Sequence, residues 1–311
     1  MTWIVLLLAA YGTVDISEVG GTQLMSVVNG GQQVSLLYMQ KLTKFDIYLY
    51  DWKQPGATPH RFTQVSWDDR VRILGFAQLV DLGTGLGLVS PGTQRMYLLT
   101  KEGAYVEEID FKPVLEDGER VQGAQSDGMD RLFLLSRLDG YDFVSRYSVT
   151  DRKRDVLFRA EQPGAMYFVA STKGFVQIRY NTGELWLFSD KFSEIHHVPG
   201  RFEAPPAPKN PLQFLRHRDV QLLTRPLIVT GPDGFLTMNY QAIQGKRRLS
   251  ASARFDGKRF LFSRYRVLAF SPDHKTKMMY DYEEDTLILA PSDLSIKESA
   301  IPPTPDIGLQ H

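Results

Sequence analysis

The sequence predicts an all-β chain, and three observations support this fold class. Short segments rich in aromatic and β-branched residues recur along the chain, and such residues favour strands. Segments with the 3.6-residue periodicity of an amphipathic helix are scarce. Polar turns follow the strand-like segments at similar intervals. The strand-like segments are Phe45–Trp52, Met96–Leu99, Phe143–Val149, Leu185–Phe188, Phe235–Tyr240 and Thr286–Leu289.

The polar turns repeat with a period near fifty residues. They fall near residues 51, 101, 151, 190, 245 and 293, at spacings of 50, 50, 39, 55 and 48 residues. In an all-β chain this period is typical of a β-propeller, whose blades are small antiparallel sheets. A single blade cannot bury both of its faces, so the blades pack against one another in a ring. Six turns predict six blades, and seven is the alternative count.

Three stretches resemble repeats of known propellers. Arg95–Gly103 and Gly183–Phe192 resemble the inner-to-outer strand hairpins of bacterial six-bladed propellers of the NHL type. Phe270–Lys275 is similar to the Phe-Ser-Pro-Asp-Gly-Lys turn of TolB-type repeats, with histidine where that family has glycine. The resemblance is one of hairpin pattern between residues 40 and 300. It implies an all-β propeller fold.

The chain divides into three parts by composition. Residues 1–40 form an N-terminal segment, residues 41–300 the propeller, and residues 301–311 an extended tail. Residues 203–211 are rich in proline, which disfavours the interior of a strand. We interpret them as a loop between blades.

The N-terminal segment contains an apolar run, Trp3–Ala10. It is too short to cross a bilayer as a helix, which needs about 20 residues. It could be a strand that closes the ring, an uncleaved anchor or a signal peptide, although no basic residue precedes it. A signal peptide predicts a periplasmic or other extracytoplasmic location, and the alternative location is cytoplasmic.

Composition excludes several kinds of chemistry. Among the 311 residues, 36 lysines and arginines balance 36 aspartates and glutamates, so no net charge draws the chain to nucleic acid or anionic lipid. Cysteine is absent, which excludes disulfides, thiolate metal sites and cysteine nucleophiles.

The two motifs that could bind a metal or a phosphate favour structural roles. His196 and His197 are consecutive, so on a strand they point to opposite faces, and only Glu194 could share a cation with His196. The glycine-rich stretch Asp81–Gly87 is not followed by a helix, as a dinucleotide-binding loop requires. We interpret it as a turn within a blade and predict no metal and no cofactor.

No catalytic constellation is evident from the sequence. The adjacent carboxylates Asp68-Asp69, Glu107-Glu108 and Glu116-Asp117 could serve a glycosidase only if the fold set their separation. No nucleophile elbow or Ser-His-Asp set is present. Catalytic residues are therefore not predicted.

Residues 246–266 carry eight basic residues and one acid, Asp256, with aromatic residues interleaved. Three interpretations remain open: a solvated face neutralised by the acids of residues 281–285, a site for an anionic protein or lipid headgroup, or a nucleic-acid groove. The third is disfavoured. The predicted partner-binding residues are Lys246, Arg247, Arg248, Arg254, Lys258 and Arg259.

The sequence thus favours a non-catalytic, protein-binding or scaffold propeller. It would be an accessory subunit of a larger, membrane-associated assembly. The alternative is a propeller hydrolase or lyase with a polar site at the axial channel. Because propellers host many functions, this interpretation depends on local chemistry rather than on fold.

Overall fold

The computed structural model describes the chain as almost entirely β-structure. It contains strands β1 to β25 and one short 3-10 turn, Lys112–Val114, with no α-helix in the described parts of the chain. No helix there has the length and apolar character that a bilayer crossing requires. The described residues are 13–14, 23–29, 32–41, 44–55, 57–66, 71, 73, 77–127, 130–161, 165–169, 174–178, 185–188, 194–198, 220–222, 227–230, 236–244, 247–255, 260–263, 265–281 and 286–292.

The chain forms two compact units. The N-terminal unit comprises Val14–Phe168 and Asp190–Phe192. The C-terminal unit comprises Met1–Thr13, Val169–Ser189 and Ser193–His311.

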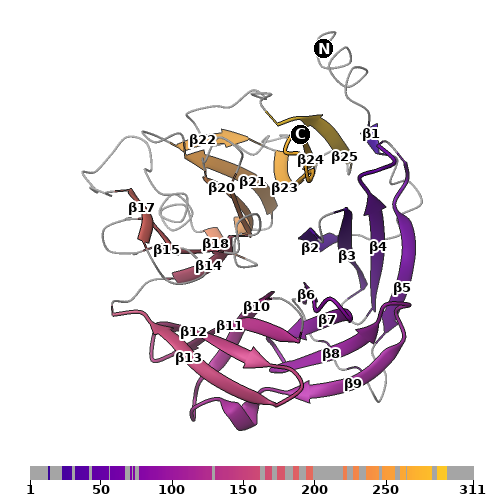
Figure 1. Cartoon of the computed structure of the whole chain (residues 1–311). Helices are drawn as coiled ribbons and strands as arrows, with labels where there is room; N and C mark the ends of the chain where they lie inside the picture. The colour runs from indigo at the N-terminus through magenta and orange to yellow at the C-terminus, as the bar shows by residue number, and fades with distance from the viewer. Residues whose placement is uncertain are drawn as a thin grey trace, which may run out of the picture. The chain divides into compact units, whose positions relative to one another are not determined.

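The N-terminal unit is built from three four-stranded antiparallel sheets, each formed by consecutive strands (Figure 1). The first sheet holds β2 (Gln23–Asn29), β3 (Gln33–Lys41), β4 (Lys44–Asp51) and β5 (His60–Ser66). The second holds β6 (Gln78–Asp81), β7 (Gly85–Ser90), β8 (Arg95–Thr100) and β9 (Tyr105–Asp110). The third holds β10 (Arg120–Ser126), β11 (Arg131–Leu138), β12 (Tyr141–Ser148) and β13 (Lys153–Arg159).

Both faces of the second sheet are buried. Leu88 and Tyr97 pack into a core shared with the first sheet. Their neighbours Val89 and Met96 pack into a core shared with the third sheet. Consecutive strand residues point to opposite faces, so a sheet covered on both sides needs apolar residues at adjacent positions. This explains the continuous apolar runs of the sequence, and it is how blades pack in a propeller.

Hydrogen bonds join the first strands of neighbouring sheets. The Leu79 amide of β6 donates to the Ser26 hydroxyl of β2 at 3.1 Å. The Ala124 amide of β10 donates to the side-chain carbonyl of Gln78 at 3.0 Å. The Gln94 side chain adds two further bonds to the β10 backbone, since its Oε1 accepts from the Val121 amide at 2.6 Å and its Nε2 donates to the Val121 carbonyl at 3.1 Å. Polar side chains thus connect sheets whose cores are apolar.

The C-terminal unit contains two sheets. The larger begins at β14, at the boundary between the units, and includes the parallel pairing of β14 with β19. Its strands are β14 (Ala165–Val169), β15 (Gly174–Ile178), β16 (Leu185–Phe188), β17 (Glu194–Val198), β18 (Val220–Leu222), β19 (Leu227–Thr230), β20 (Leu236–Gln244), β21 (Arg247–Phe255) and β22 (Phe260–Ser263). The smaller holds β23 (Tyr265–Phe270), β24 (Thr276–Asp281), β25 (Thr286–Pro291) and, beside β25, β1 (Thr13–Val14).

Each of the six segments predicted to be strands overlaps a strand of the structure: β4, β8, β12, β16, β20 and β25. Trp52 and Val149 lie in the turns that follow β4 and β12, and Phe235 lies outside the described residues. The turns predicted near residues 51, 101 and 151 each join the third and fourth strands of a four-stranded sheet. The all-β prediction is therefore confirmed.

One boundary differs from the sequence-based division. The first four-stranded sheet starts at Gln23, before the boundary drawn at residue 41. The difference arises because β2 and β3 carry few aromatic residues, and their apolar and polar residues alternate only weakly. These two strands are therefore recognised from their pairing in the sheet that contains β4 and not from their local sequence. Trp3–Ala10, the proline-rich residues 203–211 and the tail 301–311 lie outside the described residues.

The turn that resembles TolB-type repeats joins β23 to β24. The Ser271 hydroxyl donates to the Asp273 carboxylate at 2.7 Å, and the His274 amide donates to the Ser271 carbonyl at 2.9 Å. The bond from Ser271, assisted by the Lys275 amide, holds the pKa of Asp273 below its usual range. His274 stands where the resembled motif has glycine, and its φ is 56°. The position therefore demands the left-handed conformation that glycine adopts without strain.

Replacing His274 by glycine should stabilise the protein by about 0.5–1 kcal/mol. A non-glycine residue in the left-handed region costs about 1–2 kcal/mol, and the greater conformational entropy that glycine loses on folding offsets about 0.5–1 kcal/mol of the gain. Thermal denaturation measures the effect. The neighbouring Lys275, whose φ is not positive, is the control: Lys275→Gly should destabilise. Equal destabilisation by both variants would contradict this account of the turn.

Candidate functional site

Three large apolar side chains of the described residues stand out by their exposure. Val106 is 53 % exposed, Val156 51 % and Leu157 37 %. Val106 lies on β9 and the other two on β13, the outer strands of the second and third sheets (Figure 1). We call these three residues the rim surface. On the outer strand of the first sheet, β5, all of the exposed side chains are polar.

A repeated β-bulge accounts for two of these exposed residues. The register of four outer strands skips one residue: Phe62 in β5, Val106 in β9, Leu157 in β13 and Ile195 in β17. A bulge inserts an unpaired residue into a strand and re-aims its side chain. The inserted residue is apolar in all four strands. Only in β9 and β13, among the bulges whose side chains the structure describes, is it exposed.

A shallow groove of about 320 Å³ adjoins Val106. Its lining includes the apolar residues Leu82 and Leu98 and the charged residues Lys101 and Glu102 from the turn between β8 and β9. A groove lined by both apolar and polar groups is suited to receive an apolar side chain from a binding partner.

An ion pair connects β9 to the third sheet beside Val106. Arg152, in the turn between β12 and β13, lies 2.8 Å from the Glu107 carboxylate of β9. Burial raises the pKa of the nearby Tyr147 phenol, and the Arg152 guanidinium opposes this rise. The neighbouring Glu108 pairs with Arg95 at 2.9 Å within the second sheet. Both carboxylates of the Glu107-Glu108 pair are therefore engaged by arginines.

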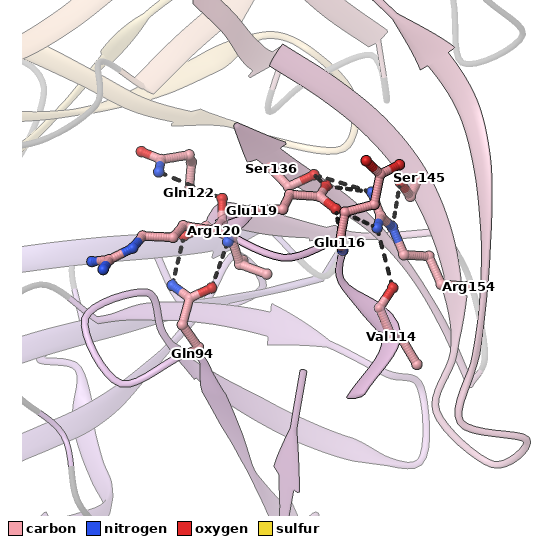
Figure 2. Close-up of polar contacts among 10 residues, drawn as sticks. Gln94, Val114, Glu116, Glu119, Arg120, Gln122, Ser136, Ser145 and Arg154 are labelled. Atoms are coloured by element: carbon pink, nitrogen blue, oxygen red, sulfur yellow. Dashed lines mark hydrogen bonds and ion pairs between the residues drawn. The ribbon is translucent and has the colours of Figure 1, made fainter. Parts of the chain in front are cut away.

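A buried ion pair fixes β13 to the rest of its sheet. Arg154 and Glu119 have side chains only 5 % and 1 % exposed, and their two bonds measure 2.7 and 2.5 Å (Figure 2). Arg154 also donates to the Val114 carbonyl at 3.1 Å and to the Ser145 hydroxyl at 2.8 Å. The Ser136 hydroxyl donates to Glu119.

The electrostatics of Glu119 reflect two opposing effects. Burial raises the pKa of its carboxyl group, but hydrogen bonds from Arg154, Ser136 and the Glu116 amide outweigh burial, so the pKa lies below its ordinary value. Glu119 is therefore a charged, fully bonded structural group. It offers no free proton acceptor to a substrate.

Two further buried carboxylates are similarly engaged. Asp46 accepts from Arg61 at 3.1 Å and from Gln64 at 2.7 Å. Asp142 accepts from Arg137 at 2.6 Å and from the Met166 amide at 2.7 Å. A general acid or base needs a lone pair or proton that is free to reach a substrate, whereas Asp46 and Asp142 accept hydrogen bonds from other groups of the fold.

The predicted partner-binding residues lie partly in the described chain. Arg247, Arg248 and Arg254 belong to β21, which pairs with β20 and β22. Lys246, Lys258 and Arg259 lie outside the described residues. Arg266, another basic residue of this segment, is buried. Its strand, β23, pairs with β24, which carries the buried Asp281. The role of this segment in binding stays a prediction.

The motifs interpreted as structural occupy strands and turns. His196 and His197 lie opposite Leu187 and Trp186 in the pairing of β17 with β16. Asp81–Gly87 spans the turn between β6 and β7, where the Asp81 carboxylate accepts from the Gly83 amide at 2.8 Å. Within the described residues, no group of three or more histidines and carboxylates could hold a metal ion.

Sequence reasoning missed the rim surface. The signal was present in β9, Tyr-Val-Glu-Glu-Ile-Asp, and in β13, Lys-Arg-Asp-Val-Leu-Phe-Arg, where an apolar residue interrupts the alternation beside charged ones. An interrupted alternation in an edge strand indicates a bulge. Exposure, however, depends on the neighbouring sheet.

Comparison with known proteins addresses the fold. No family model matches the chain, and no curated protein matches it. A solved member of the DUF4221 family from Bacteroides vulgatus is similar to it at a TM-score of 0.55 and 8 % identity, covering 90 % of this chain and 94 % of its own.

Two other solved structures are similar at a TM-score of 0.50. One is a structural-genomics protein of unknown function from Bacteroides thetaiotaomicron, with 9 % identity, covering 91 % of this chain and 73 % of its own. The other is a luciferin-regenerating enzyme, with 10 % identity and coverages of 89 % and 93 %. At such identities the likeness concerns fold alone. Together with the four-stranded antiparallel sheets and the cores shared between them, it identifies the chain as a β-propeller.

Proposed function

We propose that this β-propeller is a non-catalytic scaffold that binds a protein partner through the rim surface. The observation that carries the proposal is the exposure of Val106, Val156 and Leu157 on the outer strands of adjacent sheets. Apolar groups gain roughly 25 cal/mol for each Å² removed from water, so a partner that covered them would bind more tightly.

The rim surface is held in a defined shape before any partner arrives. The Arg154–Glu119 pair anchors β13, and the Arg152–Glu107 pair connects β9 with the turn that precedes β13. Pre-organised groups lose little conformational entropy on binding, which favours affinity. This rigidity supports a docking role.

The chemistry of the described first strands supports a non-catalytic role over a hydrolase or lyase. Their partly buried polar side chains include Ser26, Gln78 and Gln125, which carry hydroxyl and amide groups, and Asp81, whose carboxylate accepts from the Gly83 amide. Ser26 and Gln78 are bonded to backbone of the neighbouring sheet. Hydroxyls and amides without an adjacent base are poor acid–base catalysts. An extracytoplasmic location and membership of a membrane-associated assembly stay predictions from the sequence.

The triple variant Val106→Ser, Val156→Ser and Leu157→Ser tests the proposal. We expect it to weaken binding of the native partner by about 10- to 100-fold, because each apolar side chain contributes about 0.5–1 kcal/mol when a partner covers it in part. Partners captured from the native cell by the wild-type chain would be identified, purified and titrated against both chains. Thermal denaturation should show that the variant remains folded, since three surface substitutions at less than about 0.5 kcal/mol each cost at most about 1.5 kcal/mol together.

The matched control replaces three exposed, uncharged polar residues by serine: Gln32, Gln33 and His60. It should leave partner binding intact. A triple rim variant that binds every purified partner with wild-type affinity would refute the proposed docking surface.

A further inference from the structure

We propose that the partner docks as an extended, acidic and apolar peptide segment that pairs as an additional strand with the outer edge of β13. This inference rests on the proposed function, because it specifies what covers part of the rim surface.

The outer edge of β13 offers backbone pairing. β13 is the last strand of the sheet β10-β11-β12-β13 and pairs there with β12 alone. Such an edge presents a row of backbone donors and acceptors, and extended peptides bind to exposed edges by adding a strand. With seven residues, β13 is long enough to give several backbone bonds.

The bulge in β13 places two apolar side chains together at this edge. Val156 lies opposite Ser145 of β12, and Leu157 is the inserted residue that follows it. Both are exposed, although consecutive residues of a regular strand would point to opposite faces. Together they form an apolar patch that the side chains of an added strand could cover.

The charges along β13 select an acidic peptide. Lys153 and Arg159 are exposed at the two ends of the strand, Asp155 is the one exposed acid between them, and the exposed acids Asp151 and Glu161 lie beyond those ends. Neither cation forms an ion pair within the described residues. The Arg159 guanidinium instead lies over the Phe143 ring, 5.1 Å from its centroid, which holds it beside the edge.

The other outer strand of the rim surface does not fit the same peptide. β9 carries three acids and no basic residue, so its edge offers no cation of its own to an acidic strand. Its two glutamates already pair with arginines from other strands and turns. Charge complementarity therefore points to β13, and Arg154, turned inward to Glu119, keeps that edge in place.

The test uses synthetic peptides of defined composition. A fluorescein-labelled peptide of five Glu-Val repeats should bind the full chain in an anisotropy titration, and one of five Lys-Val repeats should bind at least about tenfold more weakly. Hydrogen exchange of the backbone amides of residues 153–159 should slow when the acidic peptide is bound, while exchange of residues 60–66 in β5 should not change.

Charge reversal tests the selection. The variant Lys153→Glu with Arg159→Glu should weaken binding of the acidic peptide about tenfold or more and improve binding of the basic peptide. The control Lys53→Glu with Lys275→Glu alters two exposed lysines elsewhere by the same charge and should leave both affinities unchanged. Melting curves of both variants confirm that they are folded.

Several results would overturn the inference. One is equal binding of the acidic and basic peptides, and another is binding of the acidic peptide without slowed hydrogen exchange in β13. A third is self-association of the chain that depends on its concentration and is lost in the Val156→Ser, Leu157→Ser variant. The last would identify a second copy of this chain as the occupant. If the triple rim variant loses a purified partner but the acidic peptide does not bind, the inference fails and the proposed function stands. If that variant keeps every partner, the proposed function fails.

Discussion

The variant Glu119→Ala should lower the free energy of unfolding by about 3–5 kcal/mol, the usual cost of removing one member of a buried ion pair. Its carboxylate is 1 % exposed and its partner Arg154 5 % exposed. Removal of the carboxylate leaves the guanidinium buried with only the Val114 carbonyl and two serine hydroxyls as acceptors. A buried charge without its counterion is among the most costly defects that a single substitution produces.

The effect can be measured by urea-induced unfolding. The double variant Glu119→Leu, Arg154→Met should lose much less stability than the two single alanine variants combined, because it removes both charges and their desolvation together. The partly exposed pair Arg95–Glu108, with side chains 28 % exposed, is the matched control. Glu108→Ala should cost at most about 1 kcal/mol. Equal losses for Glu119→Ala and Glu108→Ala would contradict the account.

The same pair predicts the behaviour of the protein in acid. The pKa of Glu119 is lower in the folded chain than the value of about 4.3 expected when unfolded. A depressed pKa means that the stabilisation is fully present above the unfolded pKa and is lost as pH falls through the folded pKa. Urea midpoints should therefore decline below about pH 4.3, and the Glu119→Gln variant should show a shallower decline.

The variant Gly103→Ala should destabilise the protein by about 2–5 kcal/mol. Gly103 has a φ of +82°, so any side chain there incurs the cost of the left-handed region, about 1–2 kcal/mol. An added Cβ would also lie 2.6 Å from the Cβ of Thr63 on the outer strand of the first sheet, which adds an overpacking cost of about 1–3 kcal/mol. Gly103 thus allows the turn of one sheet to approach the strand of another.

Gly140 supplies a matched control for this prediction. Its φ is +86°, and an added Cβ would meet nothing within 4 Å. Gly140→Ala should therefore show the conformational cost alone, about 1–2 kcal/mol. The difference between the two variants in a thermal or urea titration measures the contact with Thr63. Equal destabilisation would mean that the two sheets do not approach each other so closely at Gly103.

Local patterns account for the strands. The segment Phe45–Trp52 could be recognised as a strand because β-branched and aromatic residues favour extended backbone whatever surrounds them. The turn Phe270–Lys275 could be recognised from its order of residues, and the structure explains how His274 replaces glycine there. The strands β2 and β3 were missed, because they depend on pairing with β4 rather than on a strong local preference.

The candidate site could not be predicted in the same way. Arg154 and Glu119 lie 35 residues apart, and their pairing requires β13 to lie beside β12 and the chain before β10 to pack against both. Between Glu107 and Arg152, the chain forms the three strands β10, β11 and β12. In the sequence, each looks like an ordinary surface charge.

By itself, the sequence determined that this protein is an all-β chain of repeated antiparallel hairpins, since strand preference and turn formation act over a few residues. Only the tertiary structure decided which side chains those repeats bury and which they expose. Phe62 and Val106 occupy equivalent bulges, yet Phe62 packs against a core and Val106 faces solvent. The physical reason is that burial depends on the sheet that lies opposite, and that contact is made by residues distant in the chain.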